Sequence, residues 1–312
     1  MIVTVTGSSG YLGSLVIPGL RRQGMKVLPF DRYRGPLVRS LRHTYLGTSS
    51  SRYGVAAARR IKRALRRVEE ALAGAGALRP TQDDILDIRG RLVERFRGSD
   101  AVVHLAALAH PNVPGAAAED YRRINFDGAV NVFEAAREAG VTRFVYSSSC
   151  QVYRINDPVR IDAFPIDETN PCPTLDEGQS PYGFLKRQFE RYLEDACAGA
   201  NLRAVSLRLE TPGMRSRMPE NFYISTSIEN TVAAFVCALT ADLPAGAHVF
   251  NVADAEVDPA IVDVQRFLAE RFPHVPNRTR GNACLLSTEK AKRALGYRPA
   301  PGGRYHELQV LW

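Results

Sequence analysis

The chain lacks the features that mark membrane proteins, secreted disulfide-rich proteins and zinc–thiolate proteins. No apolar run approaches the roughly 20 residues of a membrane-spanning helix, and residues 1–6 lack the basic start and long apolar stretch of a secretory signal. The five cysteines are widely spaced and include no CxxC pair, so neither a disulfide framework nor a cysteine zinc site is indicated. We therefore expect a cytoplasmic protein with no metal site and no membrane contact.

Acidic residues are missing from one long segment. Between Arg32 and Arg67 there are eleven Lys or Arg residues and no Asp or Glu. This segment accounts for the net charge of +8, because 30 basic and 33 acidic residues occur elsewhere. A single basic segment without a recognised nucleic-acid motif does not predict nucleic-acid binding.

Strand and helix patterns alternate along the chain. Its 312 residues, 45% of them hydrophobic, suffice for one large α/β domain or two smaller ones. Short apolar runs predict strands at 2–6, 26–30, 100–105, 142–147, 202–207 and 248–252. Helical patterns predict helices at 11–23, 116–140, 181–199, 227–239, 259–271 and 287–295. This alternation predicts an α/β protein with a doubly wound parallel sheet of the Rossmann type.

Glycines at positions 7, 10 and 13 lie between the first predicted strand and the first predicted helix. Gly7 permits a tight turn, Gly10 lets the backbone approach a pyrophosphate, and Gly13 allows close packing of the helix. Asp31 ends the second strand, where a carboxylate binds the adenosine ribose and repels a 2′-phosphate. The pattern predicts NAD as the cofactor. Arg32 and Arg34, which follow Asp31, could each accept a 2′-phosphate and leave NADP as the less favoured alternative.

The chain between the second strand and residue 87 is nearly twice as long as an ordinary strand–helix–strand connection of roughly 30 residues. Residues of about 34–80 therefore hold an insertion. Within it, Ile61, Leu65, Val68 and Leu72 recur at helical spacing and predict an amphipathic helix with a basic outer face. A solvated surface helix, a subunit contact and the capture of an anionic ligand are alternative uses of this helix.

Tyr182 and Lys186 are one helical turn apart, which places both side chains on one face of their helix. An ammonium group beside a phenol favours the phenolate, so Tyr182 is a candidate general base. The strand predicted at 142–147 runs into three hydroxyl side chains, Ser147, Ser148 and Ser149, at the edge where doubly wound sheets bind ligands. Each pattern alone is also common in ordinary helices and turns.

Together these clusters resemble the extended short-chain dehydrogenases/reductases of the NAD-dependent epimerase/dehydratase family. The resemblance covers nearly the whole chain and includes residues 104–108, 131–136, 251–254 and 285–297. It implies that Ser149 holds the substrate oxygen, that Tyr182 exchanges its proton, and that Lys186 binds the nicotinamide ribose. The cofactor contacts expected from the motif and the resemblance are Gly7, Gly10, Tyr11, Leu12, Gly13, Asp31, Arg32, Asp87, Ile88, Leu105, Ala106, Ala107, Tyr182 and Lys186.

Two places depart from the family pattern. Cys150 and Gln151 stand where sugar 4,6-dehydratases carry an Asp–Glu pair, so elimination of water by those carboxylates is not expected. The segment 213–228 is shorter than in typical sugar-nucleotide epimerases, and the usual Asn and Tyr after the sixth strand are absent. The candidate substrate contacts are Ser149, Cys150, Gln151, Arg208, Arg215 and Arg217.

We expect a dinucleotide-binding domain at 1–207 and a reduced substrate-binding part at 208–312, of which 226–252 returns to the sheet. The expected activity is NAD-dependent oxidoreduction at a secondary alcohol or ketone of a sugar or sugar-like substrate, by an epimerase or reductase that forms a homodimer. A nucleotide-sugar substrate, a dehydratase-like reaction through Cys150 and a non-catalytic cofactor-sensing role remain open.

Overall fold

The structure is a computed structural model that describes residues 1–32, 83–108, 116–155, 161–172 and 181–306, together with residues 60–61, 64–65, 67–68 and 71–72. The chain divides into two compact units. The first contains Met1–Phe144 and Ser180–Leu185, and the second contains Val145–Gln179 and Lys186–Glu307.

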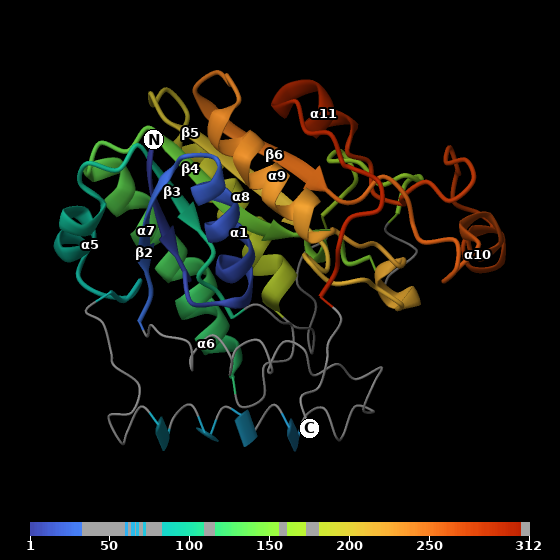
Figure 1. Cartoon of the computed structure of the whole chain (residues 1–312), viewed down its shortest axis with the longest axis horizontal. Helices are drawn as coiled ribbons and strands as arrows, with labels where there is room; N and C mark the ends of the chain where they lie inside the picture. The colour runs from blue at the N-terminus through green and yellow to red at the C-terminus, as the bar shows by residue number, and fades with distance from the viewer. Residues whose placement is uncertain are drawn as a thin grey trace. The chain divides into compact units, whose positions relative to one another are not determined.

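Six strands of the described chain form one sheet in the order β2-β1-β3-β4-β5-β6. Their bounds are β1 Ile2–Thr6, β2 Lys26–Phe30, β3 Ala101–His104, β4 Arg143–Ser149, β5 Arg203–Leu209 and β6 Gly246–Val252. In the first unit β1 pairs in parallel with β2 and β3, and in the second β5 pairs in parallel with β6 (Figure 1). Val3, Thr4 and Val5 of β1 alternate between the two faces of the strand and are at most 2% exposed, which is typical of a central parallel strand covered on both faces. The predicted doubly wound parallel sheet is confirmed.

The helices alternate with these strands. In chain order they are α1 Tyr11–Arg22, α5 Arg89–Phe96, α6 Ala118–Arg122, α7 Gly128–Glu138, α8 Pro181–Ala196, α9 Ile228–Thr240, α10 Val264–Arg271 and α11 Glu289–Leu295. Two short 3-10 turns, η2 (Cys150–Tyr153) and η4 (Pro219–Asn221), follow β4 and β5.

Three helical segments differ from the sequence prediction. A π-helical turn, η1 (Arg123–Asp127), interrupts the helix predicted at 116–140. The helix predicted from residue 259 begins only at Val264, because Asp263 caps it by accepting the N–H of Arg266. The pattern did not predict α5, of whose eight residues only Leu92 and Phe96 are buried.

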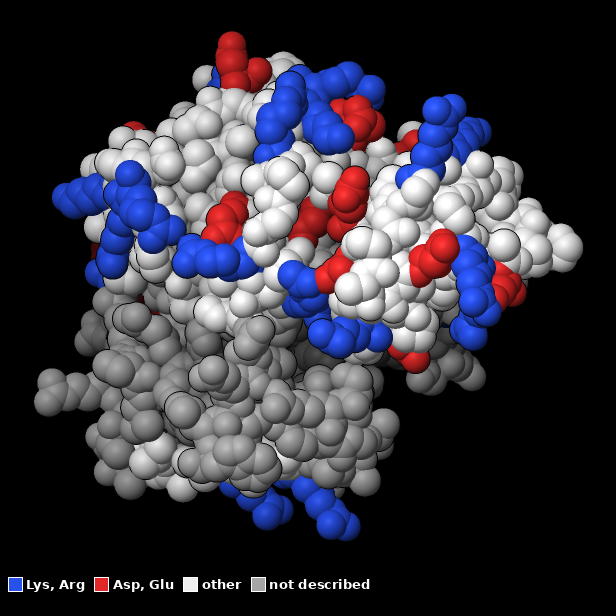
Figure 2. All heavy atoms as spheres, turned by 45° about the vertical axis from the view of Figure 1, so that its right-hand side comes forward, with Lys and Arg blue, Asp and Glu red and all other residues white. Residues whose placement is uncertain are grey.

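Of the basic insertion, the structure describes only eight residues. All eight are helical, including Ile61, Leu65, Val68 and Leu72, which agrees with the predicted amphipathic spacing. The Val68 side chain is 45% exposed. The rest of the predicted insertion lies outside the described residues. On the described surface seen in Figure 2, basic and acidic side chains lie next to one another.

The second unit has an aromatic core that anchors the segment after β5. The ring centroid of Phe222, at the end of η4, lies 5.5 Å from that of Phe164 and 5.3 Å from that of Phe272. In both pairs the ring planes are nearly perpendicular. All three rings are buried. Such edge-to-face packing stabilises aromatic clusters, and here it holds η4 against the rest of the unit.

Candidate active site

The glycine-rich turn after β1 is too tightly packed for a side chain at two of its three glycines. Gly7 has a φ of +67°, and a Cβ there would lie 2.6 Å from the backbone nitrogen of Ala106. A Cβ on Gly13 would lie 2.7 Å from the carbonyl oxygens of Gly7 and Ser8. A Cβ on Gly10 would meet only the Gly7 carbonyl oxygen, at 3.1 Å. Gly7 and Gly13 therefore serve backbone packing, and Gly10 keeps the start of α1 free of a side chain.

The start of α1 fits a bound dinucleotide. Gly10 is the N-cap and offers no side-chain cap to the helix, and the helix dipole favours an anion there. Asp31, directly after β2, is buried, and its Oδ2 accepts the N–H of Ser9 at 2.9 Å. The carboxylate is thus held beside the glycine turn, at the end of β2 where ribose recognition is expected.

The other predicted cofactor contacts of the first unit surround this turn. Leu105, Ala106 and Ala107 follow β3 and are partly buried, and the N–H of Leu105 donates to the carbonyl oxygen of Thr6 at 3.2 Å. In α1, Tyr11 is buried and Leu12 is partly exposed. These residues lie where the motif predicts them, and their contacts with a cofactor remain a prediction.

Asp87 and Ile88, which the resemblance places at the adenine, directly precede α5, and Ile88 is its N-cap. One oxygen of Asp87 accepts the N–H of Ile88, and the other lies 3.2 Å from Arg91. Ile88 is 68% exposed. In this structure the pair therefore stabilises the first turn of α5.

A second Asp–Ile pair, Asp84 and Ile85, precedes this one, and Asp84 reaches the residue that follows Asp31. Asp84 Oδ2 is 3.7 Å from Nε of Arg32, the residue after Asp31. Ile85 is buried and packs against Gly128 of α7. The same two residue types occur at 84–85 and 87–88, which is the signal that could have identified the first pair. Its position makes it the better candidate for the adenosine end of the site.

Tyr182 and Lys186 lie one turn apart on α8, and both are buried. The Lys186 Nζ donates to the carbonyl oxygen of Ser147 at 2.7 Å and lies 4.6 Å from the ring centroid of Tyr146. Burial lowers the pKa of Lys186 to about 7, although the charge of Glu190 opposes the shift. The ammonium group is thus directed to the carboxyl-terminal part of β4.

Ser149 ends β4, and its Oγ accepts the N–H of Gln151 at 3.2 Å. The next residue, Cys150, is fully buried, with Sγ 3.5 Å from the carbonyl oxygen of Arg208. Burial, together with the charge of Glu210, raises the pKa of this thiol well above its usual value. A thiol so buried and so weakly acidic is poorly suited to exchange protons with a substrate. The geometry therefore does not favour a dehydratase-like reaction through Cys150.

The sequence matches the profile of the NAD dependent epimerase/dehydratase family over residues 3–236. The chain belongs to this family. It is 30% identical to the UDP-glucose 4-epimerase of Homo sapiens over 322 residues, which cover 99% of this chain and 80% of that protein. It is 31% identical to the L-arabinose 1-dehydrogenase (NAD(P)(+)) of Haloferax volcanii over 229 residues, 69% of this chain and 80% of that protein.

Solved structures of similar fold include a UDP-glucose-4-epimerase from Stenotrophomonas maltophila with bound NAD and formylated UDP-arabinopyranose. The TM-score is 0.64 at 22% identity, and the match covers 99% of this chain and 94% of that one. The predicted family and the predicted cofactor are confirmed: the chain is an NAD-dependent enzyme of the epimerase/dehydratase family.

No helix in the described part of this family member has the length and apolar character needed to cross a membrane. Likewise, the residues that the structure describes contain no cluster of three or more His, Cys, Asp or Glu side chains able to hold a metal ion.

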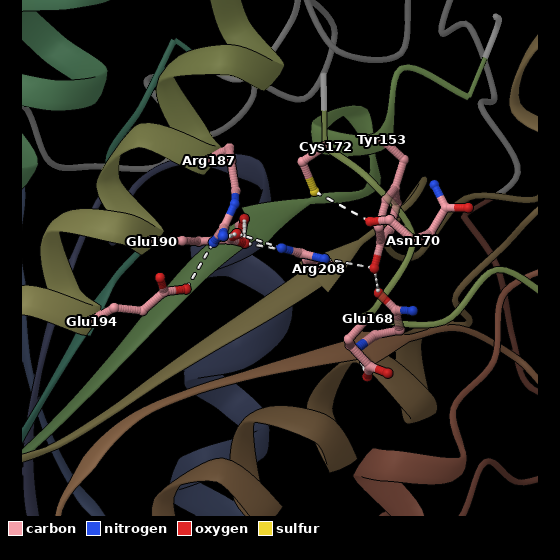
Figure 3. Close-up of polar contacts among 10 residues, drawn as sticks. Tyr153, Glu168, Asn170, Cys172, Arg187, Glu190, Glu194 and Arg208 are labelled. Carbon is pink, nitrogen blue, oxygen red and sulfur yellow. Dashed lines mark hydrogen bonds and ion pairs between the residues drawn. The ribbon is translucent and has the colours of Figure 1, made fainter. Parts of the chain in front are cut away.

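Arg208 of β5, a predicted substrate contact, is instead enclosed within the second unit of the enzyme. Its Nε and Nη2 donate to the two carboxylate oxygens of Glu190 at 2.9 and 2.6 Å, and Nη1 donates to the Tyr153 hydroxyl at 2.6 Å. Figure 3 shows the guanidinium lying between these partners. The Tyr153 hydroxyl then donates to Asn251 at 2.7 Å. Arg208 is 2% exposed, and all three of its nitrogens are already bound to Glu190 or Tyr153, which does not fit the prediction that it contacts a substrate anion.

The two later arginines differ from Arg208. Arg215 pairs with Asp258 and lies over the ring of Tyr305, 4.4 Å from its centroid. Arg217 is exposed. Their contacts with substrate remain predictions.

The sequence prediction missed Glu190, the main partner of Arg208. Tyr182, Lys186 and Glu190 follow one another at intervals of four on α8, and this extended spacing is the signal that could have identified it. Glu190 also accepts a hydrogen bond from the hydroxyl of Ser148 at 2.6 Å. Through these contacts α8 and β5 support the strand that ends in Ser149.

Proposed function

We propose that the enzyme epimerises a secondary hydroxyl of a sugar carried on a nucleoside diphosphate, in a cycle of NAD-dependent oxidation and reduction. The observation that supports this most strongly is the similarity to human UDP-glucose 4-epimerase over 99% of this chain. The side chains that such a reaction needs, Ser149, Tyr182 and Lys186, are all present and buried at the end of β4 and on α8.

When bound, NAD supplies the acceptor and then the donor of the hydride at the carbon that bears the hydroxyl. Tyr182 takes the hydroxyl proton as general base, and Ser149 donates a hydrogen bond to the same oxygen. The charged form of Lys186 favours the phenolate of Tyr182. Because the pKa of Lys186 is lowered to about 7, this support decreases as the pH rises through that value.

A sugar dehydrogenase is the second candidate. It is favoured by the short segment between residues 213 and 228 and by the 31% identity to L-arabinose 1-dehydrogenase. The two reactions differ in the fate of the cofactor. An epimerase returns the hydride to the sugar, so NAD is not consumed, whereas a dehydrogenase releases one reduced cofactor per product. Chromatography of UDP-glucose and UDP-galactose, with absorbance of the reduced nicotinamide followed in parallel, separates the two.

Substitution Tyr182→Phe tests the proposed general base. We expect turnover to fall by roughly 10²- to 10⁴-fold, the usual contribution of acid–base catalysis, while NAD binding is retained. Tyr192→Phe is the matched control, because it makes the same change further along α8, where Tyr192 stacks on Phe189. Equal turnover of the two variants would contradict the role of Tyr182.

A further inference from the structure

Glu210 is a buried carboxyl group with no ion-pair partner among the described residues. It directly follows β5 and is 8% exposed. Its Oε1 accepts a hydrogen bond from Nδ2 of Asn221 at 3.2 Å, and its Oε2 accepts one from Nε2 of Gln151 at 3.5 Å. A carboxylate has about four acceptor sites, so two neutral donors, one of them at the limit of hydrogen-bond length, satisfy it incompletely.

Gln151 connects Glu210 to the predicted catalytic serine. The N–H of Gln151 donates to Ser149 Oγ at 3.2 Å, while its side-chain amide reaches Glu210. Ser149 ends β4 and Glu210 follows β5, and these two strands are neighbours in the sheet. The carboxyl ends of parallel strands are where enzymes of this architecture bind ligands. Glu210 therefore lies at the substrate edge of the sheet.

The segment after β5 holds the carboxyl group in place from the other side. The hydroxyl of Ser216 donates to Oδ1 of Asn221 at 2.5 Å, which turns the amide nitrogen of Asn221 toward Glu210. The Thr226 hydroxyl donates to the backbone carbonyl oxygen of Glu210 at 3.0 Å. Both the backbone and the side chain of Glu210 are thus fixed by neutral groups.

Left-handed backbone conformations flank both ends of this arrangement. Thr211 has a φ of +39°, and Phe222 and Tyr223 have φ values of +56° and +57°. These backbone conformations are unfavourable for residues other than glycine and are frequent at functional sites. They adjoin Glu210 and Asn221 directly.

Burial raises the pKa of Glu210 to about 7, and the hydrogen bonds from Asn221 and Gln151 oppose the shift only in part. Among the described residues, the Cys150 thiol on η2 is electrostatically coupled to Glu210, and its own pKa is raised by burial and by Glu210. The guanidinium of Arg208, two residues earlier on β5, is bound to Glu190. A buried carboxyl group with no cation is energetically costly, and in a ligand-binding region such a group indicates function.

We propose that Glu210 is a specificity-determining residue: its carboxyl group hydrogen-bonds a hydroxyl of the sugar and excludes sugars that carry a carboxylate at that position. The inference rests on the proposed function. A sugar hydroxyl can donate to the ionised form of Glu210 and accept from the protonated form, so a neutral sugar fits both. A carboxylate can only accept, so it fits the protonated form and is repelled by the ionised form.

The test compares UDP-glucose with UDP-glucuronic acid, two nucleotide-sugars that differ by one carboxylate. Binding to the NAD-loaded enzyme is measured by calorimetry at pH 6 and pH 8. Because the acid binds only the protonated form of a group with a pKa of about 7, its affinity relative to UDP-glucose should fall about tenfold between the two pH values. In Glu210→Gln the ratio of the two affinities should be the same at both pH values, and the acid should bind more tightly than in the wild type at pH 8.

Glu220→Gln is the matched control, because Glu220 is exposed on the same turn as Asn221 and its loss should leave the wild-type pattern intact. A ratio that is independent of pH in the wild type and unchanged in Glu210→Gln would overturn the inference and leave the proposed function standing. Failure of the wild type to bind either compound would contradict the proposed function, and the inference with it.

Discussion

Glu190 and Glu210 are two buried glutamates of the same unit that differ in their surroundings. Glu190 accepts hydrogen bonds from two nitrogens of Arg208, from Arg187 and from the hydroxyl of Ser148. Glu210 accepts from two neutral amides in the described part of the chain. The first carboxylate has two guanidinium counter-charges and a hydroxyl donor, whereas the second has only neutral donors among the described residues.

The difference shows how burial and function can be separated. A buried carboxylate that forms two hydrogen bonds with a guanidinium connects the helix and strand that carry the two groups. Removal of one partner leaves the charge of the other buried and unpaired. A buried carboxyl group without a cation destabilises the folded state whenever it ionises. Glu190 is therefore a structural group that connects α8, β4 and β5, whereas Glu210 is retained at a cost in stability, as expected of a ligand-binding group.

Glu190→Gln should have the largest effect on stability. The substitution removes the carboxylate that is hydrogen-bonded to the buried guanidinium of Arg208, so the free energy of unfolding should fall by roughly 3–5 kcal/mol. Urea denaturation measures the loss. The matched control is Glu194→Gln, because Glu194 pairs with Arg187 from a side chain that is 44% exposed; here the change should stay within about 1 kcal/mol. Equal losses in the two variants would show that Arg208 needs no counter-charge.

Glu210→Gln should act in the opposite direction, and only at high pH. The folded-state pKa of Glu210 is about 7, against an ordinary value of 4.5. The folded state therefore keeps a proton that the unfolded state has lost, and the wild type loses stability as the pH rises from about 4.5 to about 7. The shift corresponds to at most about 3 kcal/mol. Denaturation at pH 5 and pH 8 should show similar stabilities at pH 5 and a more stable variant at pH 8, whereas a constant difference would contradict the assignment.

Arg187→Ala should have the smallest effect. Arg187 bonds to Glu190 at 3.2 Å and to Glu194 at 2.8 Å, but its side chain is 24% exposed. Glu190 keeps both bonds from Arg208 after this change, so the loss in unfolding free energy should be about 1 kcal/mol or less. A loss as large as that of Glu190→Gln would make Arg187 the main counter-charge.

The fold could be predicted largely from local patterns. All six strands lie within a few residues of their predicted positions, because each is a short apolar run between polar turns. The α5 helix escaped prediction because only Leu92 and Phe96 of it are buried, too few to produce a clear helical period. The π-helical turn at Arg123–Asp127 lies within a continuous helical pattern that does not reveal it.

Residues of the candidate site could be predicted only where a sequence motif reflects the local geometry. Gly7 and Gly13 were recognised because their spacing reflects close backbone contacts. The sequence predicts Arg208 as a ligand-binding residue, since its counter-charge, Glu190, lies on a different element 18 residues earlier in the chain and is not evident from the local pattern. Glu210 was missed because its burial and its lack of a cation are properties of the tertiary structure.

The unfolding free energies of Glu190→Gln, Glu210→Gln and the wild type at pH 8 show whether the two buried glutamates have different roles. We expect changes of opposite sign: Glu190→Gln should be less stable than the wild type, and Glu210→Gln should be more stable. If both variants were destabilised to a similar extent, the two buried glutamates would serve the same structural purpose, and the distinction between them would be wrong.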